Sequence, residues 1–292
     1  MKILLTGVSG QVGHELVRYL GELGDLVAVD RNGMDLEDLD HVRHVIRAVR
    51  PQLIVNPAAY TAVDLAESEP DRAMAINCHA PAIMAEEASR LGAAMIHYST
   101  DYVFDGTKAS PYREDDCPNP VSVYGATKLA GEQAIVASGV PHIILRTSWV
   151  YGTRGKNFLL TIRRLAQERS ELRIVSDQAG APTWSGTIAA ATAGIVSQGL
   201  QADDAHTWWQ ERSGIYHLTS QGQTTWHGFA SAIVDRLPFE NKPLVLPITS
   251  QEYPTPAKRP KYSVLSSERF TKEFCSLPYW DDVLDDVMRT LL

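Results

Sequence analysis

The stretch TGVSGQVG, residues 6–13, decides how the first part of this chain is expected to fold. It follows a short apolar run and places glycines at Gly7, Gly10 and Gly13. In a turn between a strand and a helix, the first glycine permits a tight reversal, the second lets the backbone approach a diphosphate, and the third packs the helix on the strand. Asp30 ends the next apolar run, where an acid that binds a ribose is expected. The stretch therefore predicts a dinucleotide-binding unit.

Downstream of this turn, short apolar runs alternate with helix-length amphipathic segments. This alternation predicts parallel strands joined by right-handed crossovers. Ser68 is expected to cap the third helix, with Pro70 in its first turn. The expected strands are KILLTG (2–7), LVAVD (26–30), LIVN (53–56), AMIHYST (94–100) and HIILRTSW (142–149), and the expected helices are 11–23, 39–49 and 71–91.

After about residue 149 the pattern loosens. YPTPAKRP (253–260) holds three prolines, which exclude a regular helix and predict a fixed loop. The other expected elements are a helix at 157–168, the loop SDQAGAPTW (176–184), a helix at 185–197, the strand IYHLT (215–219) and a helix after Trp226. We expect an α/β fold: a Rossmann-like doubly wound parallel sheet over 1–150, some later segments returning to it, and a smaller C-terminal substrate-binding lobe over 151–292.

Composition excludes several classes of function. The 292 residues include 27 Lys and Arg against 35 Asp and Glu, a net charge of −8, and no basic block, which argues against a nucleic-acid partner. The cysteines Cys78, Cys117 and Cys275 lack a CxxC spacing, which predicts a reducing compartment and neither a disulfide framework nor a zinc site. Neither a signal segment nor an apolar run long enough to span a membrane is apparent. We expect a cytoplasmic protein with no membrane partner.

The choice of dinucleotide stays open on the residues alone. Asp30 favours a free ribose 2′-hydroxyl, whereas the adjacent Arg31 is able to pair with a 2′-phosphate, so NADPH and NADH are both retained. NPAAYT (56–61) follows the third expected strand, at the carboxyl edge where open α/β sheets bind ligands. Ala58 and Ala59 are small enough for a cofactor to lie against the backbone there, although two alanines that merely pack would look the same.

A possible reaction centre lies in VYGATKLAGE (123–132), which places Tyr124 four residues before Lys128. On a helix this spacing puts both side chains on one face, and a cation near a phenol is expected to lower its pKa and make it a usable proton donor. Ser99 and Thr100 end the fourth expected strand and provide a third polar group for a carbonyl. The pair alone proves little, because solvated helix faces carry the same residues.

Taken together, these motifs resemble the short-chain dehydrogenase/reductase superfamily in its extended form, which acts largely on nucleotide sugars. The glycine signature, Tyr124 with Lys128, and Thr100 occur in the family's order and spacing. The resemblance sharpens to the dTDP-4-dehydrorhamnose reductase family and covers nearly the whole chain. The segments that carry it are MKILLTGVSGQVG, AAYTAVDLAESEP, HYSTDYVFDG, VYGATKLAGE, RTSWVYG, DQAGAPT and YPTPAKRP.

This resemblance implies NADPH- or NADH-dependent reduction of the C4 ketone of dTDP-4-dehydro-β-L-rhamnose, the last step of dTDP-L-rhamnose biosynthesis for polysaccharides. It implies that Tyr124 protonates the developing alkoxide, that Lys128 holds the nicotinamide ribose and tunes Tyr124, and that Thr100 donates to the substrate oxygen. The expected cofactor contacts are Gly7, Gly10, Gln11, Val12, Gly13, Asp30, Arg31, Asp35, Leu36, Ala58, Ala59, Tyr60 and Lys128.

The resemblance also implies a set of substrate contacts. They are Thr61, Val63, Thr100, Tyr102, Tyr124, Trp149 and Arg259. Arg259 is assigned to the diphosphate because a guanidinium binds phosphate oxygens in a bidentate manner. Taken without the family, Val63 and Trp149 suit the core better, and Arg259 suits a solvated loop.

A metal site is not expected. Some family members bind Mg²⁺ through glutamates at a dimer contact, and Glu15 matches one such position. Gly186 stands where a second glutamate is needed, so Mg²⁺ is retained only as an alternative that the sequence disfavours. Monomer and homodimer both stay open, and the pair Trp208 and Trp209 suits either an exposed contact or packing within the lobe.

Two other functions compete with the reductase. A nucleotide-sugar epimerase or dehydratase of the same superfamily would keep NAD bound and return the hydride to the same sugar. A non-catalytic NADP-binding subunit, like the relatives that regulate a methionine adenosyltransferase, need not keep Tyr124, Lys128 and Thr100. All three are present here.

Overall fold

A parallel six-stranded sheet forms the centre of the computed structural model, which describes residues 1–291. The strands lie in the order β10-β5-β4-β3-β1-β2. The chain therefore moves outward from β1 to β2, returns to β3 on the other side of β1, and continues to the far edge. This reversal beside β1 confirms the doubly wound α/β fold. The strands are β1 (Lys2–Leu5), β2 (Asp25–Ala28), β3 (Leu53–Asn56), β4 (Ala94–Thr100), β5 (His142–Thr147) and β10 (Gly214–His217).

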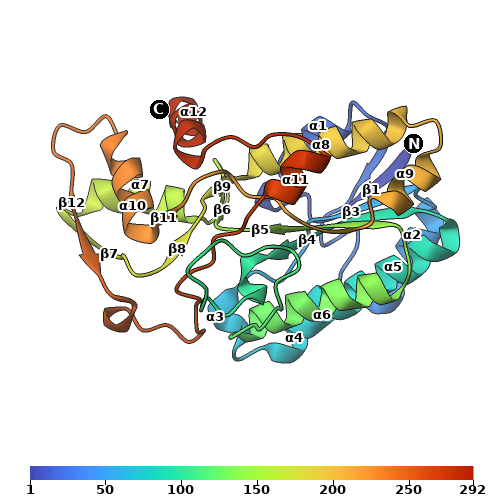
Figure 1. Cartoon of the computed structure of the whole chain (residues 1–292), viewed down its shortest axis with the longest axis horizontal. Coiled ribbons are helices and arrows are strands. Elements are labelled where there is room, and N and C mark those ends of the chain that lie inside the picture. Colours follow the sequence, from blue (N-terminus) through green and yellow to red (C-terminus); the bar gives the residue numbers. More distant parts are fainter. Residues whose placement is uncertain (292) are drawn as a thin grey trace.

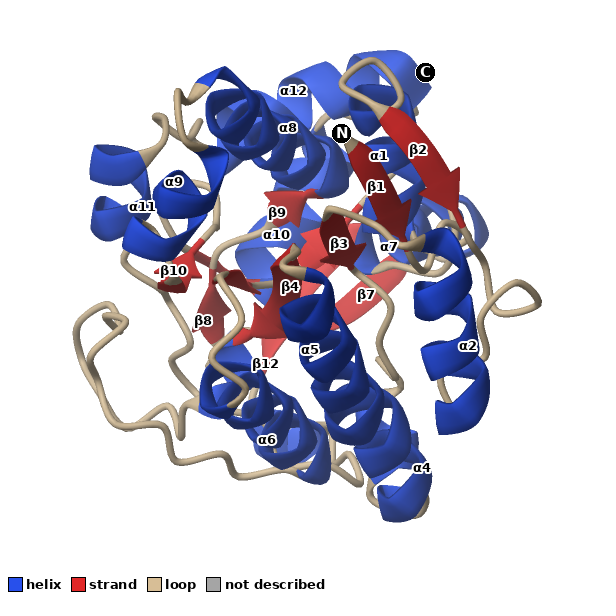
Figure 2. Ribbon diagram, turned by 90° about the vertical axis from the view of Figure 1, so that its right-hand side faces the viewer, coloured by secondary structure: helices blue, strands red, loops and turns tan. Residues whose placement is uncertain are grey.

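Helices cover both faces of this sheet (Figure 2). On one face α1 (Gln11–Leu20) packs against α8 (Ser185–Gln201), and on the other lie α2 (Leu39–Val49), α5 (Ala80–Leu91) and α6 (Val123–Ala137). Strands β3, β4 and β5 are buried along their whole length because both of their faces are covered. Burial on both faces explains why their sequences lack an alternation of apolar and charged surface residues, and their polar residues, such as His97 and Arg146, are buried too.

Side-chain caps mark the starts of several helices. The side chain of Asp38 accepts a hydrogen bond from His41 N at the start of α2, and that of Ser122 accepts one from Gly125 N at the start of α6. The expected cap at Ser68 is wrong: α4 (Pro70–Met74) begins after Glu69 without a side-chain cap. Ser68 instead donates to Leu65 O at 3.0 Å, at the end of the short helix α3 (Val63–Ala66).

The long helix expected at 71–91 is interrupted. A π-helical turn, η1 (Ala75–His79), joins α4 to α5 and buries Asn77 against the neighbouring elements. Such turns widen a helix by one residue and are frequent at functional sites. A periodicity of 3.6 residues does not reveal a one-residue insertion, so the sequence predicted one continuous helix.

A smaller lobe lies at the left end of Figure 1. There β7 (Glu171–Val175) pairs in parallel with β12 (Leu244–Ile248), and α7 (Phe158–Glu168), α10 (Trp226–Asp235) and α12 (Trp280–Leu291) enclose an apolar core. Neither β7 nor β12 was expected. The boundary at residue 150 stays a prediction, since α8 and β10 lie with the central sheet although they follow that residue.

The loop expected at 176–184 contains two short strands, β8 (Ala179–Gly180) and β9 (Thr183–Trp184), which pair with β11 (Thr224–Thr225) and β6 (Val150–Tyr151). Residues 253–260 form neither helix nor strand, as the prolines predicted. The remaining elements are η2 (Asp101–Val103), η3 (Ser250–Glu252), α9 (Ala205–Glu211) and α11 (Glu268–Glu273).

The two adjacent tryptophans serve packing. The rings of Trp208 and Trp209, in α9, meet edge to face with centroids 4.9 Å apart. Both rings lie close to Gly199 of α8, where a Cβ would be 3.2 Å from each of them. This answers the question that the sequence left open for them. Among the described residues, no helix has both the length and the apolar character that crossing a membrane requires.

Candidate active site

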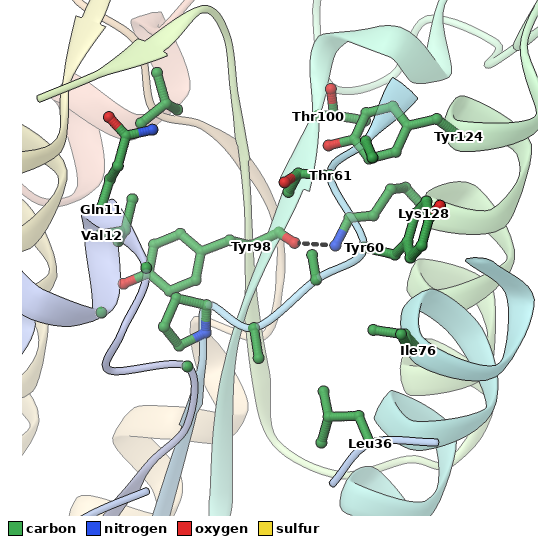
Figure 3. Close-up of a pocket in the computed structure, with 18 of the residues that line it drawn as sticks. Gln11, Val12, Leu36, Tyr60, Thr61, Ile76, Tyr98, Thr100, Tyr124 and Lys128 are labelled. Atoms are coloured by element: carbon green, nitrogen blue, oxygen red, sulfur yellow. Dashed lines mark hydrogen bonds between the residues drawn. The ribbon is translucent and has the colours of Figure 1, made fainter. Parts of the chain in front are cut away.

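A pocket of about 740 Å³ opens at the carboxyl ends of the sheet strands (Figure 3). Every cofactor and substrate residue expected from the sequence lines it, except Arg259. The lining residues that were expected are Gly7, Gly10, Gln11, Val12, Gly13, Asp30, Arg31, Asp35, Leu36, Ala58, Ala59, Tyr60, Thr61, Val63, Thr100, Tyr102, Tyr124, Lys128 and Trp149. Segments distant in sequence therefore meet in one cavity, although their individual roles stay predictions.

The glycine turn at one end of the pocket has no room for side chains. Gly7 has a φ of +59°, and a Cβ there would lie 2.9 Å from Ala58 Cα. A Cβ on Gly13 would lie 2.2 Å from Gly7 O. The turn leads into the N-terminus of α1, whose free N–H groups and dipole favour an anion. This arrangement fits a dinucleotide diphosphate.

Charges of both signs surround the adjoining rim of the pocket. Asp30 Oδ1 accepts hydrogen bonds from Asn32 N at 2.9 Å and Gly33 N at 3.1 Å. Arg31 forms ion pairs with Asp35 and Glu37, and Arg72 reaches Glu37 Oε1 at 3.0 Å. Two guanidinium groups therefore share the carboxylate of Glu37 at this rim.

Asn77, presented by the π-helical turn, holds the wall of the pocket around Tyr60. Its Oδ1 accepts from Tyr60 N at 2.9 Å, and its Nδ2 donates to Tyr60 O and to Thr127 Oγ1, each at 3.1 Å. The loop after β3 is thus tied to α6, which carries Tyr124 and Lys128. The π-helical turn thus supplies the side chain that joins the two segments.

Thr100, Tyr124 and Lys128 come together deep in the pocket (Figure 3). Thr100 ends β4, while Tyr124 and Lys128 project from the first turns of α6. The Thr100 hydroxyl donates to Asp101 Oδ1 at 3.0 Å and accepts from Tyr102 N at 3.2 Å, and it also acts on the pKa of Tyr124. One hydroxyl therefore contacts a buried carboxyl group and influences the tyrosine.

The electrostatics of this group differ from the expectation. Burial raises the pKa of Tyr124 to about 12, the hydrogen bond with Thr100 lowers it, and the charge of Asp101 raises it. The predicted lowering of the Tyr124 pKa by a nearby cation is therefore wrong for this structure. Burial also lowers the pKa of Lys128 to about 8, against the raising effect of Glu132, and raises the pKa of Asp101 to about 6.

Aromatic rings line the opposite end of the pocket. Trp149 has a φ of 48° and stacks on Trp226 with ring centroids 3.5 Å apart. A Cβ on Gly180 would lie 2.4 Å from the Trp149 ring, so the indole rests on bare backbone. The Tyr102 ring meets the Tyr124 ring edge to face at 5.8 Å. Flat rings of this kind suit the apolar edge of a sugar.

Arg259 lies in a second hollow of about 740 Å³, next to Lys258 and Lys261. Its Nη2 contacts Asp64 Oδ2 at 2.7 Å, while Asp64 Oδ1 accepts from Ala257 N at 3.2 Å. The guanidinium is thus fixed in an ion pair rather than solvated. Its expected contact with a diphosphate stays a prediction.

The position matched to a second metal-binding glutamate has no space for one. Gly186 is buried, and a Cβ there would lie 2.5 Å from the Trp184 ring. Within the described residues, no three His, Cys, Asp or Glu side chains group closely enough to hold a metal ion.

Sequence reasoning missed several residues that line the pocket: Arg72, Tyr98, Lys156 and Trp226. Trp226 forms the second half of the aromatic stack, yet it lies far from Trp149 in sequence and belongs to no motif. Tyr98 lies within the run AMIHYST, where its position two residues before Thr100 indicated that both face the same side of the sheet.

Known proteins resemble this chain over its full length. The family described as "RmlD substrate binding domain" matches residues 1–292. A "dTDP-4-dehydrorhamnose reductase" of Burkholderia thailandensis is 46% identical over 299 residues, covering 100% of this chain and 99% of the relative. A protein of the same name from Escherichia coli K12 is 43% identical and covers 96% of this chain and 94% of the relative.

Solved structures extend this likeness. The dTDP-4-dehydrorhamnose reductase of Bacillus anthracis in complex with NADP has a TM-score of 0.89 and 33% identity, with 99% of each chain covered. A UDP-glucose 4-epimerase of Thermus thermophilus in complex with NAD has a TM-score of 0.80 over 100% of both chains but only 19% identity, which shows the fold alone. Because the family model matches all 292 residues and a relative is 46% identical over the whole chain, the chain belongs to the family of the RmlD substrate binding domain.

Proposed function

We propose that this chain reduces the C4 ketone of dTDP-4-dehydro-β-L-rhamnose to give dTDP-β-L-rhamnose, using NADPH or NADH. The observation that carries the proposal is the meeting of Thr100, Tyr124 and Lys128 in one pocket with the glycine turn. Full-length relatives that bear the name of this reductase support the choice of substrate. The epimerase neighbours support only the shared fold.

The pocket fits a nicotinamide dinucleotide, which supplies a hydride when bound. Gly7, Gly10 and Gly13 would hold its diphosphate, since added side chains would collide with backbone there or crowd it. Asp30 and Arg31 would bind the adenosine ribose, and Lys128 the nicotinamide ribose. A solved relative in complex with NADP supports NADPH as one cofactor, and the pair of arginines Arg31 and Arg72 suits a 2′-phosphate.

The residues of this chain supply the proton and the orientation of the substrate. Tyr124 would donate its proton to the oxygen at C4 as negative charge develops there. The Lys128 ammonium would stabilise the resulting phenolate, which is costly because burial raises the pKa of Tyr124 to about 12. Thr100 would donate a hydrogen bond to the same substrate oxygen and so keep it beside the Tyr124 hydroxyl.

Sugar recognition would fall to the residues around the aromatic end of the pocket. Trp149 and Tyr102 would cover the methyl edge of a 6-deoxy sugar, and Thr61 and Val63, which line the same pocket, would contact it as well. Arg259 would bind the diphosphate of the nucleotide sugar from the adjoining hollow. The stacked partner Trp226 would keep Trp149 from turning away.

The test follows the absorbance of NADPH, and separately of NADH, as purified protein meets enzymatically generated dTDP-4-dehydro-L-rhamnose. We expect oxidation stoichiometric with dTDP-rhamnose, and a loss of kcat of about 100-fold or more in Tyr124→Phe. Tyr216→Phe is the matched control, because the Tyr216 hydroxyl donates to Arg212 O, just after α9, and Tyr216 lies outside the pocket. Cofactor binding without oxidation would refute the proposed substrate.

A further inference from the structure

A buried polar chain runs from the end of β1 to Lys128. Thr6 Oγ1 lies 2.6 Å from Asn56 Oδ1, Asn56 Nδ2 lies 3.1 Å from His97 Nδ1, and His97 Nε2 lies 3.3 Å from Lys128 Nζ. Thr6 and Lys128 are about 1% exposed, and Asn56 and His97 are fully buried. The four side chains come from β3, β4, α6 and the turn that follows β1. Fully buried polar side chains that satisfy one another hold a single geometry.

The ammonium of Lys128 has well-defined partners. Its Nζ donates to Tyr98 O at 2.6 Å, a length typical of a charged donor (Figure 3). An ammonium carries three N–H groups and no acceptor. With one directed to Tyr98 O and one to His97, a third remains for the pocket that Lys128 lines. The protein thus uses β4 to aim the remaining N–H.

Hydrogen-bond balance then fixes the state of His97. A charged Lys128 requires Nε2 to be an acceptor, so a neutral ring carries its proton on Nδ1. Nδ1 then donates to Asn56. This requires the amide of Asn56 to be reversed relative to the structure, which has Oδ1 toward Thr6 and Nδ2 toward the ring. The two ends of an amide are nearly alike in shape, so this orientation occupies the same space. In the opposite orientation, Nε2–H and the ammonium would be two donors facing each other.

We propose that His97, held by Asn56 and Thr6, is a positioning residue that accepts a hydrogen bond from Lys128 and keeps its ammonium charged and aimed into the pocket. This role rests on the proposed function only insofar as Lys128 serves the reaction. Burial lowers the pKa of His97 well below its ordinary value, which keeps the ring neutral and able to accept. A leucine at this position would remove the acceptor and leave Lys128 in more apolar surroundings.

Other ionisable groups also affect the pKa of Lys128 or of its neighbour Tyr124. Glu132, one turn further along α6, raises the pKa of Lys128, and its carboxylate is itself paired with Arg146 of β5 at 2.6 Å. Tyr124 lies on the same face of α6, and Asp101 of η2 acts on Tyr124. His97 from β4 is the partner that a single substitution removes without altering these charges.

The first test needs neither a variant nor turnover. Nitrogen-15 NMR of the ring in the intact protein at pH 7 should show His97 neutral, with Nδ1 protonated and Nε2 bare. Protonation of Nε2 would overturn the proposal. Titration of the Lys128 side chain by carbon-13 NMR, assigned with Lys128→Met, should place its pKa lower in His97→Leu than in the wild type, by about one unit or more. An unchanged Lys128 pKa in folded His97→Leu would also overturn it.

Kinetics separate positioning from a merely structural role. In His97→Leu we expect kcat to fall about tenfold or more, and the alkaline limb of the pH profile to move to lower pH. His97→Gln keeps an amide oxygen at a similar reach and should restore most of both. His142→Leu removes a buried histidine from the neighbouring strand and should move neither. If wild-type protein shows no turnover, the proposed function falls while the NMR result on His97 still stands or fails by itself.

Discussion

The hydroxyl of Thr100 donates its proton to the carboxyl group of its neighbour Asp101 at 3.0 Å. That carboxyl group also accepts from Ser148 Oγ at 3.0 Å and is hydrogen-bonded to Ser263, so three segments converge on it. The single hydroxyl proton of Thr100 is therefore directed to Asp101 while Asp101 is ionised. The expected donation from Thr100 to a substrate oxygen requires that this proton turn away from Asp101.

Asp101 should make stability depend on pH. Burial raises its pKa from the ordinary 3.8 to about 6, so the unfolded chain loses this proton first as pH rises. The neutral form of Asp101 stabilises the folded state by about 3 kcal/mol. This contribution is fully present below pH 3.8 and is lost as pH rises through about 6. Relative to wild type, Asp101→Asn should therefore gain free energy of unfolding between pH 4.5 and 8, measured by urea denaturation.

Asp105 offers a control of opposite sign for this measurement. Hydrogen bonds from Asn119 and Thr107 hold its pKa below the ordinary value, so its contribution is present at neutral pH and lost toward acid. Asp105→Asn should lose stability at pH 8 and little at low pH. Parallel curves for Asp101→Asn and wild type would refute the role given to Asp101.

The ion pair between Arg146 and Glu132 should dominate the stability of the contact between α6 and β5. The guanidinium meets the carboxylate at 2.9 and 2.6 Å, and both side chains are at most 2% exposed. Arg146→Met leaves Glu132 buried and unpaired, which should cost about 3–5 kcal/mol of unfolding free energy by chemical denaturation. The double variant with Glu132→Leu should recover most of that loss.

An exposed pair supplies the control for this comparison. Arg164 and Glu168 meet at 2.7 Å on α7 with about half or more of each side chain exposed. Arg164→Ala should change the free energy of unfolding by about 0.5 kcal/mol or less. Equal losses at Arg146 and Arg164 would show that burial does not set the cost.

The sequence predicted the sheet domain well because physical constraints are local there. Gly7 and Gly13 stand where a side chain would collide with backbone, and β3 to β5 are rich in apolar residues because helices cover both faces. The smaller lobe was predicted less well. Proline is uncommon within strands, yet Pro247 lies in β12, which pairs only with β7, so its other edge needs no donor.

The site was predictable where motifs are contiguous and not where folding brings distant residues together. Tyr124 and Lys128 lie four apart, so their shared face follows from helix geometry. The stack of Trp226 on Trp149 and the ion pair of Asp64 with Arg259 join positions that no spacing relates. The pKa of Tyr124 was misjudged because spacing reveals a nearby cation but not the depth of burial.

Gly13 should be essential for cofactor binding. An alanine methyl there would lie 2.2 Å from Gly7 O, so the glycine turn would have to open. We expect Gly13→Ala to weaken NADPH binding by about 100-fold, equal to about 2.7 kcal/mol, in a fluorescence titration. Gly194→Ala, in α8, is the control, because a Cβ there would meet no atom within 4 Å. This substitution should raise the free energy of unfolding by about 0.5–1 kcal/mol. Equal NADPH affinities in the two variants would contradict the assignment.

Arg259 should govern affinity for the nucleotide sugar rather than for the dinucleotide. Its guanidinium is fixed by Asp64 beside the second hollow, and its Nε is buried without a partner among the described residues. If it binds the substrate diphosphate, Arg259→Ala should raise the KM for the nucleotide sugar about tenfold or more and leave the Kd for NADPH unchanged. Arg173→Ala removes an arginine that pairs with Glu252 in the same lobe at 3.0 Å, and it should change neither constant. A rise in the NADPH Kd for Arg259→Ala with an unchanged sugar KM would instead place the guanidinium on the cofactor side.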